Sequence, residues 1–144
     1  MSPPSDSNRF AQAWDEFLLA LRRSQARGLP GEELTLAQYY LLAPLLKARA
    51  VPITQLAIGA GISAPTASKV IDGLEREGMV SRQRSADDRR AVLVAITPQG
   101  TATFKRRARQ LAHRRRLIYE RLAPEEREPS ERLLRHLAQV IGEL

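Results

Sequence analysis

The sequence contains no cysteine, which excludes disulfide bonds, thiolate metal sites and nucleophilic thiols together. Its two histidines, His113 and His136, lie on helical stretches beside arginines, without metal-ligand spacing to a carboxylate or a second histidine. No serine has the context of a nucleophile elbow, and residues 59–61 (Gly-Ala-Gly) are typical of a turn, not of a phosphate loop. We therefore expect no metal, no cofactor and no enzymatic activity.

Long apolar runs are also missing. No stretch approaches the roughly 18 apolar residues that a membrane span needs, and the chain does not open with a charged-then-apolar leader. With 43% hydrophobic and 27% charged residues in a chain of 144, the composition is typical of one globular domain. Residues 1–8 are polar and proline-bearing, so we expect a flexible tail there, in a cytoplasmic protein without a membrane partner.

The middle of the chain has the pattern of a helix-turn-helix. Ala57 is small enough for two helices to approach closely, and Gly61, four residues later, suits a left-handed turn that is easy only for glycine. Ile62, Ala67 and Val70 then form an apolar face on the second helix. A short helix with small polar residues on its outer face fits the DNA major groove. The residues expected on that outer face are Ser63, Ala64, Pro65, Thr66, Ser68 and Lys69. Ser63 is also expected to cap the second helix.

A basic β-hairpin follows directly, and it favours DNA binding over an ordinary αα-corner, which has the same packing needs. Two short β-prone runs, residues 78–84 and 91–96, flank the polar, turn-forming segment 85–90. Arg89 and Arg90 lie at this tip, and an arginine there can enter a narrow minor groove, where the negative potential is deepest. The alternative is a solvated hairpin whose charges only keep a sheet edge soluble.

Asp88 has the wrong charge for a direct approach to DNA, so we expect its carboxylate to pair with a nearby arginine and hold the tip in shape. Arg90 is the expected minor-groove residue, and Arg89 a supporting phosphate contact. The complete set of predicted DNA-binding residues is Ser63, Ala64, Pro65, Thr66, Ser68, Lys69, Arg82, Arg84, Asp88, Arg89 and Arg90.

Three segments together resemble one known family. Residues 56–63 begin with Leu-Ala and end with Gly-Ile-Ser, residues 74–82 begin with Leu-Glu-Arg-Glu-Gly-Met-Val, and residues 88–100 read Asp-Arg-Arg-Ala-Val-Leu-Val-x-Ile-Thr-x-x-Gly. This set resembles the MarR family of bacterial transcription regulators (multiple antibiotic resistance regulators), over residues 9–142. The resemblance implies a homodimeric winged-helix repressor, occasionally an activator, that binds pseudo-palindromic double-stranded DNA. It also implies release by small, often phenolic or aromatic anionic molecules; without cysteine, a redox-sensing role is not expected.

The remaining sequence predicts helices over residues 9–27, 35–47, 98–121 and 133–144. Thr35 can cap the second of these helices. A threonine followed by a proline at the first helical position opens the third. The fold class is therefore mainly α with a small β-hairpin wing.

These elements divide into a winged helix-turn-helix at 35–97 and flanking dimerisation helices at 9–34 and 98–144. The flanking helices carry more apolar surface than so small a head can cover, so the simplest partner is a second copy of the chain. A bundle folded back on its own head is the alternative.

The net charge of the chain is +7, and the positive excess lies in residues 97–121, which contain eight Lys or Arg and one acidic residue. These basic side chains either form a solvated face or create a positive field that attracts DNA.

Three positions depart from the family pattern. Pro44 lies within the second helix and should kink it, because it crowds the carbonyl of Tyr40. Gly73 stands where the family tends to have a longer, usually basic residue, so one phosphate contact should be missing. Pro129 should break the last helix, with Ser130 as the cap of a fresh one.

The resemblance also implies an effector pocket between the dimerisation helices and the winged head. Onto that region the sequence places its densest aromatic grouping, and Arg115 interrupts a stripe that is otherwise apolar. Aromatic walls with one cation suit a planar aromatic or anionic ligand. Alternatively, the aromatics are core and the head of Arg115 reaches water. The predicted pocket residues are Trp14, Phe17, Tyr39, Tyr40 and Arg115.

A second function class stays open at this point. A winged helix can also dock protein or RNA without binding an operator. The outward face of the second helix and the wing arginines separate the two classes, and here the small polar face and the arginines favour DNA.

Overall fold

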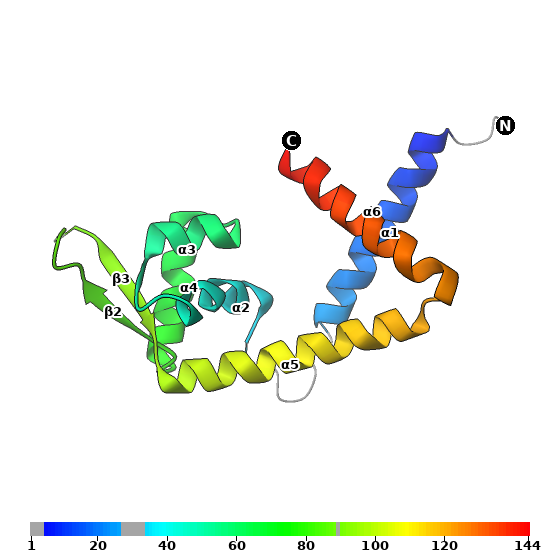
Figure 1. The fold of residues 1–144 in the computed structure, drawn as a ribbon. Coiled ribbons are helices and arrows are strands. Elements are labelled where there is room, and N and C mark those ends of the chain that lie inside the picture. Colours follow the sequence, from blue (N-terminus) through cyan, green and yellow to red (C-terminus); the bar gives the residue numbers. More distant parts are fainter. Residues whose placement is uncertain (1–4, 27–33, 89) are drawn as a thin grey trace. The chain divides into compact units, whose positions relative to one another are not determined.

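The computed structural model describes residues 5–26, 34–88 and 90–144, in two compact units of residues 1–33 and 34–144 (Figure 1). The described part of the first unit is one helix, α1 (Asp6–Ala26). It begins three residues before the expected start, because Asp6 places an acidic charge in the first turn and pairs with Arg9. Residues 6–8 are therefore helical and not part of a tail, whereas residues 1–4 and the expected helix end near residue 27 lie outside the described residues.

The second unit begins with α2 (Leu36–Leu42), whose first turn is capped in both directions. The Oγ1 of Thr35 accepts the N–H of Gln38 at 3.2 Å, and the Oε1 of Gln38 accepts the N–H of Thr35 at 2.8 Å. This reciprocal pair satisfies two donors that a helix start would otherwise leave without partners. The predicted role of Thr35 as a cap is confirmed.

The predicted continuation of this helix to residue 47 is wrong. α2 ends at Leu42, and the chain continues as a 3₁₀-helix, η1 (Ala43–Leu46), with Pro44 in its first turn. Pro44 has no N–H for the carbonyl of Tyr40, and its ring crowds that carbonyl, so α-helical bonding cannot continue through it. The tighter 3₁₀ turn takes the place of the expected kink.

The helix-turn-helix consists of α3 (Ile53–Ala60) and α4 (Ala64–Arg76). Gly61 ends α3 in the left-handed conformation, with φ +66°, and its N–H donates to the carbonyl of Ile58 at 3.1 Å. A Cβ at this position would meet nothing within 4 Å, so the backbone conformation, not a lack of space, requires glycine. Ala57 is buried beneath this turn region. The predicted turn is confirmed.

The wing is an antiparallel hairpin of β2 (Val80–Arg84) and β3 (Val92–Ile96), close to the predicted runs. A third strand, β1 (Val51–Pro52), pairs with the other edge of β3, so the strand order is β1-β3-β2. The side chains of Val51 and Val94, which face each other in the register, are both buried. The proline in β1 is tolerated because β1 is an edge strand.

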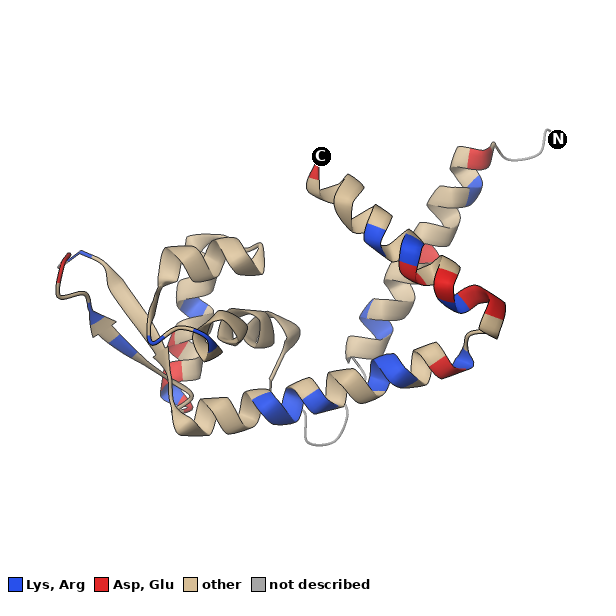
Figure 2. Ribbon diagram, in the orientation of Figure 1, with Lys and Arg blue, Asp and Glu red and all other residues tan. Residues whose placement is uncertain are grey.

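The wing leads into α5 (Pro98–Arg121), a long helix that carries many of the basic residues (Figure 2). Thr97 joins the two elements: its Oγ1 accepts the N–H of Gly100 at 3.0 Å and donates to the carbonyl of Gly78 at 2.7 Å. The N–H of Thr97 also donates to the carbonyl of Met79 at 3.0 Å. The predicted cap at Thr97 is confirmed, and the same residue attaches the start of α5 to the chain that follows α4.

The last helix, α6 (Pro124–Gly142), is continuous, so the predicted break at Pro129 is wrong. Proline removes one N–H donor, which here deprives the carbonyl of Glu125 of its helical partner. Glu125 is exposed, and water can solvate its carbonyl. Ser130 does not start a new helix; its Oγ donates to the carbonyl of Arg127 at 2.8 Å. In the described ranges, no helix is both long and apolar enough to cross a membrane.

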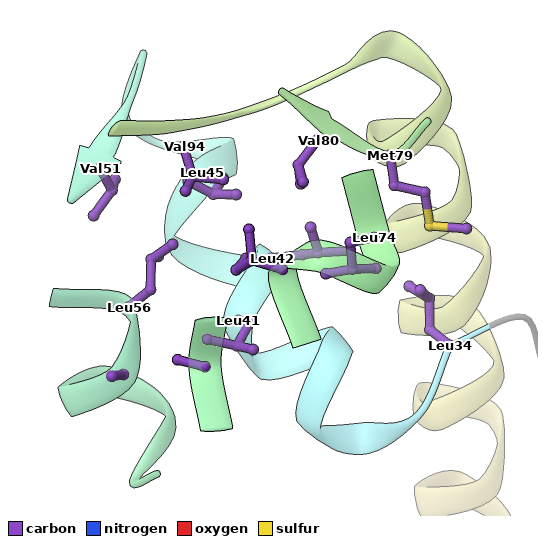
Figure 3. Packing of buried hydrophobic residues seen from close by; sticks show 13 residues of the cluster. Leu34, Leu41, Leu42, Leu45, Val51, Leu56, Leu74, Met79, Val80 and Val94 are labelled. Carbon is purple, nitrogen blue, oxygen red and sulfur yellow. The ribbon is translucent and has the colours of Figure 1, made fainter. Parts of the chain in front are cut away.

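The core lies where α2, α3 and α4 meet the hairpin (Figure 3). Leu34, which the sequence assigns to a flanking dimerisation segment, is buried in this cluster. Leucines from the helices fill the centre, and valines from the strands close one side. The buried apolar residues of the cluster are Leu34, Leu41, Leu42, Leu45, Val51, Leu56, Ala57, Ala67, Ile71, Leu74, Met79, Val80 and Val94.

Gly100→Ala should destabilise the fold, because a Cβ there would clash with the backbone carbonyl of Met79 and come within 2.9 Å of Cγ1 of Ile96. Forcing this contact should lower the free energy of unfolding by about 1–3 kcal/mol. Gly59→Ala is the matched control, because a Cβ at Gly59 meets nothing within 4 Å and alanine favours a helix. Urea denaturation at one protein concentration measures both variants; equal midpoints would contradict the close approach at Gly100.

Candidate nucleic-acid interface

The first turn of α4 is organised by Ser63. Its Oγ accepts the N–H of Thr66 at 3.3 Å and lies 2.8 Å from the Oγ1 of Thr66, and Pro65 occupies the first turn of the helix. This confirms the predicted cap. Ser63, Ala64, Pro65, Thr66 and Lys69 are exposed, and Ser68 is half-buried.

The opposite face of α4 is apolar and closed to solvent. Ala67, Ile71 and Leu74 have no exposed surface. Val70, which the sequence places on the same face, is half-buried and packs against the cluster. Because the inner face is fully used by the core, the small polar residues are the part of α4 that a ligand can reach.

The wing tip is held by hydrogen bonds to the backbone. The Oγ of Ser85 accepts the N–H groups of Asp87 and Asp88 at 3.3 and 3.4 Å, and Asp88 Oδ1 accepts the N–H of Arg90 at 2.9 Å. The N–H of Ala91 donates to the carbonyl of Asp88 at 3.0 Å. Asp88 therefore shapes the tip, as expected, and among the described residues it does so through the backbone N–H of Arg90.

Arg90 is exposed, and within the described part of the chain its side chain has no ion pair. A hollow of about 320 Å³ lies beside it, lined on the opposite side by Ile53 and Thr54 at the start of α3. The wing arginine thus borders a recess between the wing and the first helix of the motif. Arg89, the other predicted tip residue, lies outside the described residues.

Arg82 and Arg84, both on β2, lie in different surroundings. Arg84 is exposed at the end of the strand, toward the tip. The guanidinium of Arg82 instead forms an ion pair with the carboxylate of Asp72 and donates to the carbonyl of Ser68 at 3.3 Å. Both acceptors are on α4. This contact was not predicted from the sequence, although Arg82 follows the buried Val80 by two residues and therefore lies on the same, inner side of the strand.

The residues predicted for an effector pocket divide between the two units. In the first unit, Trp14 stacks on Phe10 with ring centroids 6.0 Å apart, and Phe17 is exposed. In the second unit, Tyr39 meets Tyr40 edge-on at 5.4 Å.

Phe104, which was not among the predicted pocket residues, completes the aromatic group of the second unit. Its ring is nearly parallel to that of Tyr39, with centroids 4.6 Å apart. Tyr40 and Arg115 are exposed. None of the predicted pocket residues lines the hollow beside the wing.

The basic side chains of α5 are mostly exposed, as a solvated face would have them. Arg107 is an exception, with 5% of its surface exposed. Acidic residues gather instead in the first turn of α6, at Glu125 and Glu126. Among the described residues, no three His, Asp or Glu side chains lie where they could hold a metal ion together.

Known proteins are similar to this chain in sequence and in structure. The model of the MarR family matches residues 34–92. The HTH-type transcriptional regulator YhbI of Bacillus subtilis (strain 168) is 26% identical over 90 residues, which are 62% of this chain and 58% of that protein. The similarity thus spans less than two thirds of this curated relative.

Two solved structures extend the similarity into the flanking helices. The transcriptional repressor CouR, bound to a 23-mer DNA duplex, is 30% identical, with a TM-score of 0.69 over 85% of this chain and 89% of that one. BpsR of Bordetella bronchiseptica, whose DNA binding is regulated by 6-hydroxynicotinic acid, is 26% identical, with a TM-score of 0.71 over 88% of this chain and 98% of that one. With its winged helix-turn-helix and these relatives, the chain belongs to the MarR family of transcription regulators.

Proposed function

We propose that the chain is a ligand-responsive repressor that binds pseudo-palindromic double-stranded DNA as a homodimer. The observation that carries this proposal is the division of α4 into a fully buried apolar face and an exposed face of small polar residues, followed by a wing with an exposed arginine. The similarity to CouR, a repressor bound to a DNA duplex, supports it. A protein that acts on bacterial DNA in this way works in the cytoplasm.

In this proposal, α4 enters the major groove with its N-terminal half. The helix has 13 residues and is therefore about 20 Å long, and a groove about 12 Å wide admits it. Ala64 and Pro65 are short, so the helix start can approach the base edges closely. The hydroxyl of Thr66 can donate to or accept from bases, and Lys69 suits a phosphate.

The wing reaches the adjacent minor groove through Arg90. The tip presents this residue because Asp88 and Ser85 satisfy backbone donors of the turn, which keeps the tip in one conformation. A narrow minor groove concentrates negative potential and attracts an arginine there. Arg84 and Arg89 are proposed as supporting phosphate contacts.

Arg90→Ala should weaken binding to specific DNA by about 1–3 kcal/mol, the scale of one good contact. Gel shifts of the full chain on the region upstream of its own gene, at several salt concentrations, measure this effect, because a phosphate-driven complex weakens steeply with salt. Arg121→Ala is the control, since it removes one exposed positive charge at the end of α5, away from the wing. Binding by Arg90→Ala at the wild-type level, with unchanged helix content, would rule out the minor-groove role.

No DNA binding by the unaltered chain would instead favour the alternative, a winged-helix module that docks protein or RNA.

The homodimer is proposed because α1 and α6 expose their apolar sides. No residue of α6 is buried within the chain, and α1 exposes aromatic and leucine side chains along its length. Large apolar residues exposed along a helix favour an association site, and a two-fold dimer matches a pseudo-palindromic operator. The large exposed apolar residues of these helices are Phe10, Phe17, Leu18, Leu19, Leu21, Leu133, Leu134, Val140 and Ile141.

Leu134→Glu should convert the protein into a folded monomer at micromolar concentration. Leu134 is 58% exposed in the single chain, so a glutamate is tolerated there, whereas an unpaired charge in a dimer interface costs about 3–5 kcal/mol. Light scattering measures the mass. Gln139→Glu, which adds the same charge at an exposed polar position of α6, should remain dimeric. A monomeric wild-type protein, or a dimeric Leu134→Glu variant, would contradict this interface.

The effector is proposed to be a planar aromatic carboxylate. Tyr39, Tyr40 and Phe104 form an aromatic group in the second unit, and Arg115 supplies an exposed cation on α5. Aromatic side chains suit the walls of a pocket for such a ligand, and Arg115, which the sequence places in this region, is the proposed partner of its carboxylate. The similarity to BpsR, whose DNA binding is regulated by 6-hydroxynicotinic acid, supports the ligand class. Trp14 and Phe17, on α1, remain predictions from the sequence.

Salicylate and 6-hydroxynicotinate should raise the melting temperature and weaken DNA binding together. The joint effect follows because only a ligand that prefers the conformation unable to bind DNA can shift both. Tyr40→Ala, at a half-exposed position, should reduce both effects while leaving DNA binding without ligand intact. Stabilisation without weaker DNA binding would show a ligand site that does not regulate, and no response to either acid would refute this ligand class.

A further inference from the structure

The guanidinium of Arg82 is directed at α4. Along β2 the side chain of Val80 is buried and that of Gln83 is exposed, so Arg82 shares the inner side of the strand with Val80. Its Nη2 donates to the carbonyl oxygen of Ser68 at 3.3 Å and forms an ion pair with the carboxylate of Asp72. One side chain of the wing therefore contacts two groups of α4, the helix proposed to enter the major groove and called the recognition helix below.

These two acceptors are suited to fix an orientation. Ser68 and Asp72 are four residues apart, so they lie on the same side of α4, one turn from each other. The side chain of Arg82 is 30% exposed and that of Asp72 is 50% exposed, so the pair is partly shielded from solvent. The Nε of Arg82 is buried and, among the described residues, has no hydrogen-bond partner. One nitrogen, Nη2, contacts both acceptors, so the end of the Arg82 side chain is held between Ser68 and Asp72 on α4.

The contact of Arg82 with α4 lies on β2, beyond the base of the hairpin. α4 and β2 are connected through residues 77–79, at the base of the hairpin. Arg82 adds a second connection two residues farther along β2 than Val80. If α4 occupies the major groove and the wing the minor groove, both must fit at the same time, which requires a defined angle between them. Binding to phosphates alone does not need this precision.

We propose that Arg82 is a positioning residue that fixes the wing relative to the recognition helix through Asp72 and Ser68. It thereby determines how strongly specific DNA is preferred over non-specific DNA. This inference rests on the proposed function. It replaces the sequence-based interpretation of Arg82 as a direct DNA contact.

Asp72→Asn separates the two roles by the sign of its effect. If Arg82 contacted DNA directly, removing the carboxylate would release the guanidinium and remove a negative charge, so all DNA would bind more tightly. A positioning role gives the opposite result for specific DNA: the preference over non-specific DNA should fall roughly tenfold, the scale of one lost base contact. Binding to non-specific DNA should not weaken.

Arg82→Ala should reduce the preference to the same extent and leave the salt dependence of non-specific binding unchanged. A phosphate contact would instead weaken all sequences equally and reduce the salt slope by about one. Arg82→Lys keeps the charge, but its side chain is shorter and reaches less far than Nη2, the atom that contacts both acceptors, so it should lose part of the preference. Gln83→Ala, on the outer side of the same strand, is the control and should bind like wild type.

The experiment is fluorescence anisotropy of the full chain on two labelled duplexes, one from the region upstream of its own gene and one with the same bases scrambled. Thermal unfolding of the same variants without DNA tests the attachment itself. Arg82→Ala and Asp72→Asn should not add in the double variant, because each removes the same contact.

The possible results distinguish this inference from the proposed function. No DNA binding by the wild-type chain would overturn the proposed function and, with it, the role of Arg82 in specificity. Wild-type binding with additive losses in melting temperature would overturn the attachment alone. Tighter binding of Asp72→Asn to both duplexes would make Arg82 a DNA contact after all.

Discussion

The inner face of α4 is closed to solvent: Ala67, Ile71 and Leu74 have no exposed surface and pack into the cluster that also contains Val80 and Val94 of the hairpin. A rotation of α4 about its axis would carry polar side chains into this cluster and leave them without hydrogen-bond partners, at a cost of about 1–3 kcal/mol for each group. The core therefore decides which residues of the helix face outward. Because Val80 and Val94 of the hairpin belong to the same cluster, the core also holds the wing beside α4.

Local chemistry explains which elements could be predicted from the sequence. The turn at Gly61 and the caps at Ser63 and Thr97 depend on residues within a few positions of each other, so the printed sequence contains all of their determinants. β1 was missed because two residues cannot show an alternation of apolar and polar side chains. The break expected at Pro129 did not occur, because whether a proline ends a helix depends on the solvation of the carbonyl one turn earlier, which a sequence does not display.

In the candidate interface, too, the features that depend on residues close in sequence could be predicted, and those that depend on tertiary packing could not. The exposed positions at the start of α4 follow from the helical period and from the apolar residues on its other side. Arg82 contacts Ser68 and Asp72, which lie 14 and 10 residues earlier in the sequence, on α4. Only the packing of β2 against α4 brings these residues together. Asp88 was correctly expected to hold the tip. Its Oδ1 accepts the backbone N–H of Arg90, and the sequence alone does not show whether a carboxylate accepts from a backbone N–H or from a nearby guanidinium.

The junction at Thr97 has a mechanical consequence for the proposed dimer. Thr97 bonds both Gly78 and Met79, and Gly100 packs against the carbonyl of Met79, so the start of α5 is attached directly to the chain that follows α4. α5 has 24 residues and extends about 36 Å from this junction, so a tilt of about 5° moves its far end by about 3 Å. Conversely, a slight displacement at the far end of α5 would tilt the winged helix-turn-helix by a comparably small angle. In the proposed two-fold dimer, where successive half-sites of DNA lie about 34 Å apart, such tilts would change the distance between the two α4 helices.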